Sequence, residues 1–407
     1  MNYTTKTLNW ITTVFAPMAE ANSTTIQVLV KAGSIYETRE TNGLSHFLEH
    51  MFFKWGKRYL TPRAVAETLD SFWASYNAFT GNEYAGYYIK CAPKYFHTTI
   101  DVLWDILVHA AFPAAEIETE KGVVIQEIAM YQDNPQSYVW HLQDERYNGD
   151  NPYGRPIIWP VNNVQWFTQD NLKEHHQALY TKDNLVIVVA GNISNQAEIE
   201  EQIGELFWSL PSAKTTPDPI YPDYKPTERS SKYIKDTQQN HLIISAPWFS
   251  NHSEDRFAAK ILAKVLGGGM SSRLFQRIRE QRWLCYYVWG AHSAADADGT
   301  FYIYAGMDKN NRDDGLAAIH AELKKISLGD VTQEEYDKAL WNIRWSTQMG
   351  IETSDQMADF LWYQQLFKGC VRSLDDVLVD YENVTLDQVN ELGSKLSQGN
   401  LWTYWME

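Results

Sequence analysis

The chain contains little cysteine, and its cysteines form no recognisable pattern. Cys91, Cys285 and Cys370 are the three cysteines among 407 residues, and no C-x-x-C spacing occurs. Their odd number and wide spacing argue against a disulfide framework. We interpret them as ordinary reduced thiols, which favours a cytoplasmic location.

Positive charge and long apolar runs are also scarce. Against 51 Asp and Glu the chain has 35 Lys and Arg, a formal net charge of −16. Nucleic-acid binding needs clustered basic side chains, so this charge balance argues against a nucleic-acid partner. No apolar run approaches the roughly 18 residues that span a bilayer, and the polar start MNYTTKTLNW has no secretory apolar core. We therefore expect no membrane partner either.

Proline is concentrated near the middle of the chain. The segment PSAKTTPDPIYPDYKPTERSS, residues 211–231, holds five of the 14 prolines. Proline interrupts both helices and strand ladders, so the segment predicts a semi-rigid linker. We expect an N-terminal domain at 1–212, a linker at 213–230 and a C-terminal domain at 231–407.

The two halves resemble each other coarsely. Both mix strand-like runs, such as TTIQVLVKAG and TFYIYAGM, with amphipathic patterns over 96–112 and 254–266. Near the end of each half an Asn-Leu pair leads into an apolar run, NLVIVVAG and NLWTYWM. The sequence predicts an α+β protein of two related domains, consistent with an ancient duplication.

The stretch GLSHFLEHMFFK, residues 43–54, carries the strongest chemical signal. Between Leu44 and Phe53 it contains no Gly or Pro, so it can be helical. Residues i and i+4 share a helix face, which turns His46 and His50 the same way, as two zinc ligands require. Glu49 can then reach a metal-bound water as general base. This H-x-x-E-H order is the inverted zinc-peptidase signature. An amphipathic helix with two solvated histidines is the alternative.

A catalytic zinc needs a third protein ligand, and a second acidic stretch offers candidates. In ETEKGVVIQEIAMYQDNP, Glu120 and Glu127 are two helical turns apart. One can bind the metal while the other orients a ligand. A solvated acidic helix face would give the same pattern.

Several motifs together resemble the M16 peptidases, a family of zinc metallopeptidases, over nearly the whole chain. These motifs are the two stretches above, NAFTGNEYAGYY, and LGGGMSSRLFQRIREQRWLCYYV in the second half. The resemblance implies two homologous α/β sandwich-like domains, each a mixed, mainly antiparallel sheet packed with helices. It assigns one zinc ion per chain to His46, His50 and Glu127, the catalytic base to Glu49, and ligand orientation to Glu120.

The resemblance also implies how substrate is held. Asn77 and Ala78 match an edge strand on which extended peptides add backbone to backbone. Arg279 and Tyr286 match a pair that the second domain brings to the substrate carbonyl. Without the resemblance, Arg279 would be an ordinary ion-pair residue and Tyr286 a core residue. The expected activity is zinc-dependent endopeptidase hydrolysis of extended or unfolded peptides.

The implied assembly is a chamber made by two two-domain chains. Short members of the family pair two chains, so we expect a homodimer, or a heterodimer with an inactive relative. A non-catalytic, peptide-binding or assembly subunit is the alternative function. The retained base Glu49 argues against it.

Tryptophan stands where similar proteins typically have glycine. The chain has 16 Trp against only 22 Gly, and glycine is normally far the commoner. The positions are Trp10, Trp55, Trp73, Trp159, Trp248 and Trp283, with Trp345 and Trp362 as further candidates. One hypothesis is a gene that reads UGA as glycine, translated with UGA as tryptophan. The alternative is a tryptophan-rich member of the family.

Overall fold

The computed structural model describes residues 3–149, 151–158, 160–212, 219, 229–398 and 401–407. Nearly all of the predicted linker, and Trp159, therefore lie outside the described residues. The chain divides into two compact units. The first comprises Met1–Met130, Asp150–Asp223 and Gly350–Ser373; the second comprises Tyr131–Gly149, Tyr224–Met349 and Leu374–Glu407.

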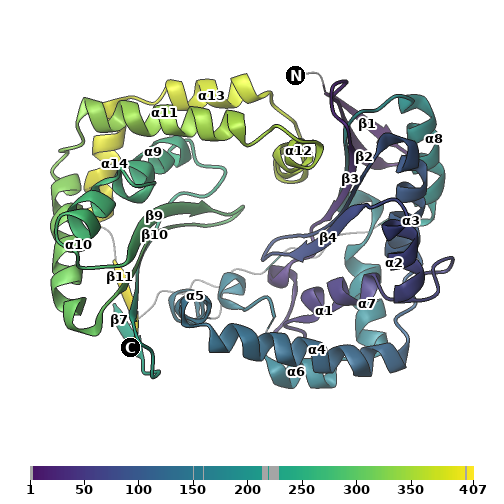
Figure 1. The fold of residues 1–407 in the computed structure, drawn as a ribbon, viewed down its shortest axis with the longest axis horizontal. Helices are drawn as coiled ribbons and strands as arrows, with labels where there is room; N and C mark the ends of the chain where they lie inside the picture. Colours follow the sequence, from purple (N-terminus) through teal and green to yellow (C-terminus); the bar gives the residue numbers. More distant parts are fainter. Residues whose placement is uncertain (1–2, 150, 159, 213–218, 220–228, 399–400) are drawn as a thin grey trace. The chain divides into compact units, whose positions relative to one another are not determined.

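A mixed sheet forms the centre of the first unit (Figure 1). In hydrogen-bonded order its strands are β1 (Thr4–Leu8), β2 (Ile11–Pro17), β6 (Leu185–Gly191), β3 (Thr24–Val30), β5 (Ala85–Cys91) and β4 (Ser75–Thr80). β2 and β6 run parallel, and the other neighbours run antiparallel. β4 pairs with β5 alone among the described strands, so its outer edge is open.

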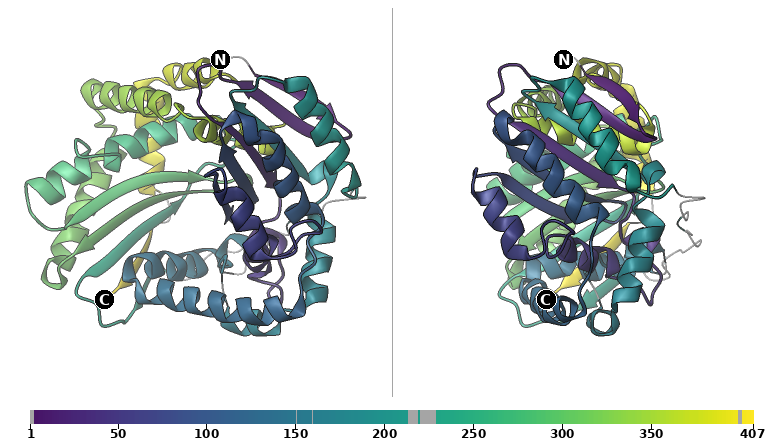
Figure 2. Two further views of the ribbon diagram at one scale, coloured as in Figure 1. Left: turned by 45° about the vertical axis from the view of Figure 1, so that its right-hand side comes forward. Right: turned by 90° about the vertical axis from the view of Figure 1, so that its right-hand side faces the viewer.

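Helices cover both faces of this sheet, because the central strands are apolar on both sides. Val28 and Ile187 face one core, whereas Leu29 and Val188 face another. The helices on the first side are α1 (Leu44–Phe52), α2 (Pro62–Asp70), α3 (Phe96–Val108), α4 (Ala114–Asp133), α6 (Val161–Trp166), α7 (Gln169–Leu179) and α8 (Gln196–Leu206). Figure 2 shows α3 and α8, which contact each other, along the sheet. The second side is covered by α12 (Ser354–Lys368).

The second unit repeats this plan with its own sheet. Its strands follow the order β7 (Ser230–Tyr233), β11 (Trp402–Met406), β8 (Asn240–Pro247), β10 (Gly299–Met307) and β9 (Tyr287–Ala294). The helices grouped with it are α9 (Arg256–Gly267), α10 (Arg312–Ser327), α11 (Gln333–Met349), α13 (Leu374–Glu382) and α14 (Leu386–Gln398). On the opposite face of the sheet lies α5 (Pro135–Asn148).

The two sheets share one topology. Leaving β1 aside, each runs in the order first, fifth, second, fourth, third strand. In both, the first and fifth strands are parallel, and the remaining neighbours are antiparallel. The apolar runs near the end of each half, β6 and β11, occupy the same place. The predicted fold class, two related α+β domains with mixed sheets, is confirmed.

The units nevertheless exchange one helix each. α12 comes from the second half of the chain and packs on the first sheet, while α5 comes from the first half and packs on the second. The compact units therefore do not coincide with the contiguous segments 1–212 and 231–407. Each exchanged helix covers an apolar face of the sheet that the other half of the chain forms.

Short turns of helix complete the described chain. They are η1 (Ser34–Tyr36), η2 (Pro93–Tyr95), η3 (Pro152–Gly154), η4 (Lys182–Asn184), η5 (Phe207–Ser209), η7 (Lys309–Asn311) and the π-helix η6 (Phe275–Glu280). None of the helices in the described chain combines the length and the apolar character needed to cross a bilayer.

Candidate metal centre

Helix α1 is amphipathic: one face packs into the core, and another carries the residues of the H-x-x-E-H motif. Its buried apolar side chains are Leu44, Phe47, Leu48, Met51 and Phe52, all in the core of the first unit. The H-x-x-E-H residues lie on its other face. The core thus fixes the helix, and the helix fixes the three polar side chains.

The N-terminus of α1 is capped from a distance. The helix begins after Gly43, whose φ is +95°, and its N-cap residue supplies no side-chain bond. Glu37 fills that role instead: Oε1 accepts from Ser45 N at 2.6 Å, and Oε2 accepts from Gly43 N at 2.8 Å and from Asn42 Nδ2 at 2.9 Å. The carboxylate satisfies orphan N–H groups at the positive end of the helix.

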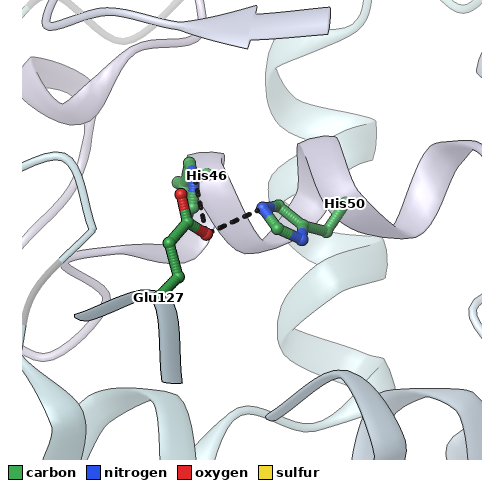
Figure 3. A group of neighbouring side chains, drawn as sticks. All are labelled: His46, His50 and Glu127. Atoms are coloured by element: carbon green, nitrogen blue, oxygen red, sulfur yellow. Dashed lines mark ion pairs between the residues drawn. The ribbon is translucent and has the colours of Figure 1, made fainter. Parts of the chain in front are cut away.

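Three ligand atoms converge beside α1 (Figure 3). Glu127 Oε2 lies 3.8 Å from His46 Nε2 and 3.4 Å from His50 Nε2, and the three atoms are all within 4.8 Å of one another. Ligands bound to one zinc ion at about 2.0 Å in tetrahedral geometry are roughly 3.3 Å apart. Two imidazoles and one carboxylate at these spacings fit three of the positions around a zinc ion.

A second carboxylate orients one of the histidines. Glu120 Oε1 lies 2.8 Å from His50 Nδ1, and Glu120 Oε2 lies 2.8 Å from the ammonium of Lys54. A hydrogen bond at Nδ1 leaves Nε2 of His50 as the ligand atom. His46 has no such partner, since its Nδ1 is buried without a hydrogen bond within the described part of the chain.

The electrostatics of the two histidines differ. Burial, together with the neighbouring His50, lowers the pKa of His46 to about 4. Burial alone would lower the pKa of His50 as well, but the Glu120 and Glu127 carboxylates raise it to about 9. Since ligand histidines must be neutral, a metal binding here displaces a proton from His50.

Glu49 directly precedes His50, and a residue of the sheet holds its carboxylate by a hydrogen bond. Its Oε2 accepts a hydrogen bond from Thr80 Oγ1 at the end of β4. Burial raises the pKa of Glu49, and the Thr80 hydroxyl partly opposes that shift. A raised pKa suits a carboxylate that must take up a proton and release it again.

The predicted edge-strand residues lie on β4. Asn77 and Ala78 pair with Tyr88 and Tyr87 of β5 in the register of the sheet. The backbone N–H of Ala78 bonds to Asn77 Oδ1 at 2.9 Å. A side chain therefore occupies a strand donor that an added strand would otherwise use.

The remaining predicted residues lie in the second unit. Arg279 lies in the last turn of the π-helix η6, and its Nε donates to the backbone oxygen of Tyr286 at 2.7 Å. The Tyr286 ring is 56% exposed, so it is not the core residue that the alternative reading required. The predicted metal-site and edge-strand residues thus lie in the first unit, and Arg279 and Tyr286 lie in the second.

Sequence reasoning missed Glu37, Lys54 and Thr80, and gave no role to two histidines. His175 and His176, adjacent residues of helix α7, are both half-buried. His175 Nε2 lies 2.9 Å from Ser45 Oγ, and His176 Nε2 lies 2.8 Å from the backbone oxygen of Leu107. Adjacent residues can both be covered because α7 packs between α1 and the end of α3.

Comparison with known proteins identifies the family. The model described as "Insulinase (Peptidase family M16)" matches residues 13–161, and that described as "Peptidase M16 inactive domain" matches 167–343. An uncharacterized zinc protease of Bacillus subtilis is 33% identical over 92% of this chain and 90% of its own. Another, of Streptomyces coelicolor, is 31% identical over 91% and 82%. The chain belongs to peptidase family M16.

Solved structures agree on the fold. A protease of Helicobacter pylori superposes with a TM-score of 0.91 at 21% identity, covering 100% of this chain and 99% of its own. A Pseudomonas fluorescens structure described as a peptidase M16 inactive domain gives 0.89 at 17% identity, covering 100% and 98%. At these identities the likeness concerns the fold alone.

Proposed function

We propose that this chain is a zinc-dependent endopeptidase that hydrolyses extended peptides. The observation that carries the proposal is the convergence of His46, His50 and Glu127 beside a half-buried Glu49. Relatives named zinc proteases support it. A structural zinc site would instead have four closed ligands and no adjacent base.

Each residue then has a distinct task. His46, His50 and Glu127 would hold zinc, which supplies Lewis acidity and a water of lowered pKa. Glu49 accepts a proton at its carboxylate and later delivers it to the leaving amine, while Thr80 keeps that carboxylate in place. Glu120 orients His50, and Lys54 neutralises Glu120.

The open edge of β4 supports an extended substrate. A peptide strand added there would receive main-chain hydrogen bonds, and the Ala78 N–H would exchange Asn77 Oδ1 for a substrate carbonyl. Only unfolded or extended segments can add to a sheet edge in this way. Arg279 and Tyr286 would assist by binding the substrate carbonyl.

We further propose that the chain works with a second two-domain chain, of its own kind or an inactive relative, enclosing a chamber. The Bacillus subtilis relative supports a two-domain length as the unit, since the match covers 90% of it. Free Cys91, Cys285 and Cys370 support a reducing compartment such as the cytoplasm.

The test is hydrolysis of a mixed set of quenched-fluorescent peptides by the wild type and by Glu49→Gln, with bound zinc measured in both. Glu118→Gln is the matched control, because Glu118 is exposed on α4 and pairs with Lys121 of the same helix. Cleavage that disappears in Glu49→Gln with zinc retained supports the peptidase. Zinc binding without cleavage by the wild type would favour the non-catalytic subunit.

A further inference from the structure

Three tryptophans adopt a backbone conformation that favours glycine. Among the described residues, five that are not glycine have positive φ: Asn9, Trp10, Trp73, Phe112 and Trp283. The tryptophan values are +72°, +53° and +54°. In this region the Cβ of an L-residue crowds its own carbonyl, and bulky side chains are the rarest occupants.

Position 10 lies in a tight hairpin. β1 and β2 pair up to Leu8 and Ile11, so Asn9 and Trp10 are the whole loop. Asn9 has φ +48°, and positive φ at both loop residues is the signature of a type I′ turn. Asn-Gly is the preferred pair for that turn. Asn9 meets the preference, whereas the tryptophan beside it does not.

Position 73 terminates helix α2. The N–H of Ala74 donates to Leu69 O at 3.0 Å, and the N–H of Trp73 donates to Asp70 O at 3.1 Å. These nested bonds are those of a Schellman cap, in which the residue with positive φ is usually glycine. Trp73 occupies that place.

Position 283 follows the π-helix in a similar way. The N–H of Leu284 donates to Ile278 O at 3.0 Å, and the N–H of Trp283 donates to Arg279 O at 3.1 Å. The nested pair is one residue wider than in a Schellman cap, in keeping with the wider π-helical turn. The residue at its centre again has positive φ.

The three side chains gain nothing that would offset this strain. Trp10, Trp73 and Trp283 are 72%, 93% and 77% exposed. Within the described chain none of their rings stacks on another aromatic ring. Tryptophan normally contributes by burial, so a solvated indole at a strained position has no structural role.

We infer that the native cell makes this protein with glycine at positions 10, 73 and 283, from UGA codons read as glycine. The argument concerns the backbone alone and is independent of the metal site. It does not extend to Trp55 and Trp248, whose φ is not positive.

Two other tryptophans fill cores, and the burial of one of them, Trp362, argues against the glycine that its sequence context suggested. Trp362 and Trp405 are 6% and 7% exposed and lie in hydrophobic cores. The indole N–H of Trp362 also donates to Asp359 Oδ1 at 3.2 Å. These two positions should be encoded by UGG. The inference therefore predicts both where UGA occurs and where it does not.

The decisive experiment reads the codons of the gene and sequences, by mass spectrometry, peptides of the protein purified from its native cells. We expect UGA with glycine in the peptides at positions 10, 73 and 283, and UGG with tryptophan at 362 and 405. UGG at the first three positions overturns the inference. UGA with tryptophan in the peptides overturns it equally.

A stability measurement tests the backbone argument separately. The triple variant Trp10→Gly, Trp73→Gly, Trp283→Gly should melt higher than the tryptophan form, by roughly 2–4 °C for each site. Trp341→Gly is the matched control: Trp341 is 66% exposed but lies within helix α11, where glycine lowers the melting temperature. A triple variant that melts lower than its parent would refute the argument.

Discussion

Glu120 and His50 are joined by a contact of 2.8 Å between Oε1 and Nδ1, on the side of the imidazole away from Glu127. Glu120 is only 2% exposed, and the ammonium of Lys54 lies against its other oxygen. The arrangement fixes both the ring orientation and the nitrogen that faces the metal.

Glu120→Gln should therefore weaken zinc binding by about 10- to 100-fold, the range typical of groups that orient a metal ligand. Competition with a chromophoric chelator measures this affinity directly. Glu118→Gln on the same helix should leave the affinity unchanged. Unaltered binding by Glu120→Gln would mean that the His50 ring is oriented by packing alone.

Glu37→Ala tests the distant cap of helix α1. Removing the carboxylate leaves buried N–H groups of Gly43 and Ser45 without acceptors, which should lower the free energy of unfolding by about 1–3 kcal/mol. Urea denaturation measures the loss. Glu40→Ala, an exposed residue three positions later, is the control. Equal stability of the two variants would contradict the capping role.

Much of this architecture could be predicted because its signals are local. The amphipathic pattern at 254–266 became α9, and the alternating run TFYIYAGM became part of β10. The i, i+4 spacing of His46 and His50 placed both on one helix face.

The missing parts depend on contacts distant in the chain. Glu37 lies six residues before Gly43, outside any capping-box spacing, so no sequence rule connects it to α1. The exchange of α5 and α12 follows from which sheet faces need covering. The covered pair His175 and His176 reflects a helix wedged between two others, which periodicity along one helix cannot show.

His176 should make the stability of the protein depend on pH. Its ring packs against Phe52, Phe112 and Tyr180, and burial lowers its pKa to about 4. A histidine whose folded pKa is below its unfolded value stabilises the fold above about pH 6.5. That contribution is lost as the pH falls towards 4.

We therefore expect the wild type to lose about 2 kcal/mol relative to His176→Gln between pH 8 and pH 5. The glutamine amide does not titrate and can still donate to Leu107 O. Urea denaturation of both proteins at the two pH values gives the difference, in which the contributions of groups that do not interact with residue 176 cancel. Parallel losses in the two proteins would show that His176 is not responsible.

Trp362→Ala tests whether helix α12 stabilises the first unit. The Trp362 ring lies 4.6 Å from that of Tyr84, which directly precedes β5, and 6.5 Å from that of Phe79, which lies on β4. Truncating a buried aromatic ring removes its contacts and leaves a cavity, which should cost about 3–5 kcal/mol in unfolding free energy. Trp341→Ala, at an exposed position of α11, should cost far less. Because α12 comes from the distant end of the chain, a large loss confined to Trp362→Ala would show that the second half of the sequence holds the first sheet together. Similar small effects in both variants would mean that α12 adds little to that sheet.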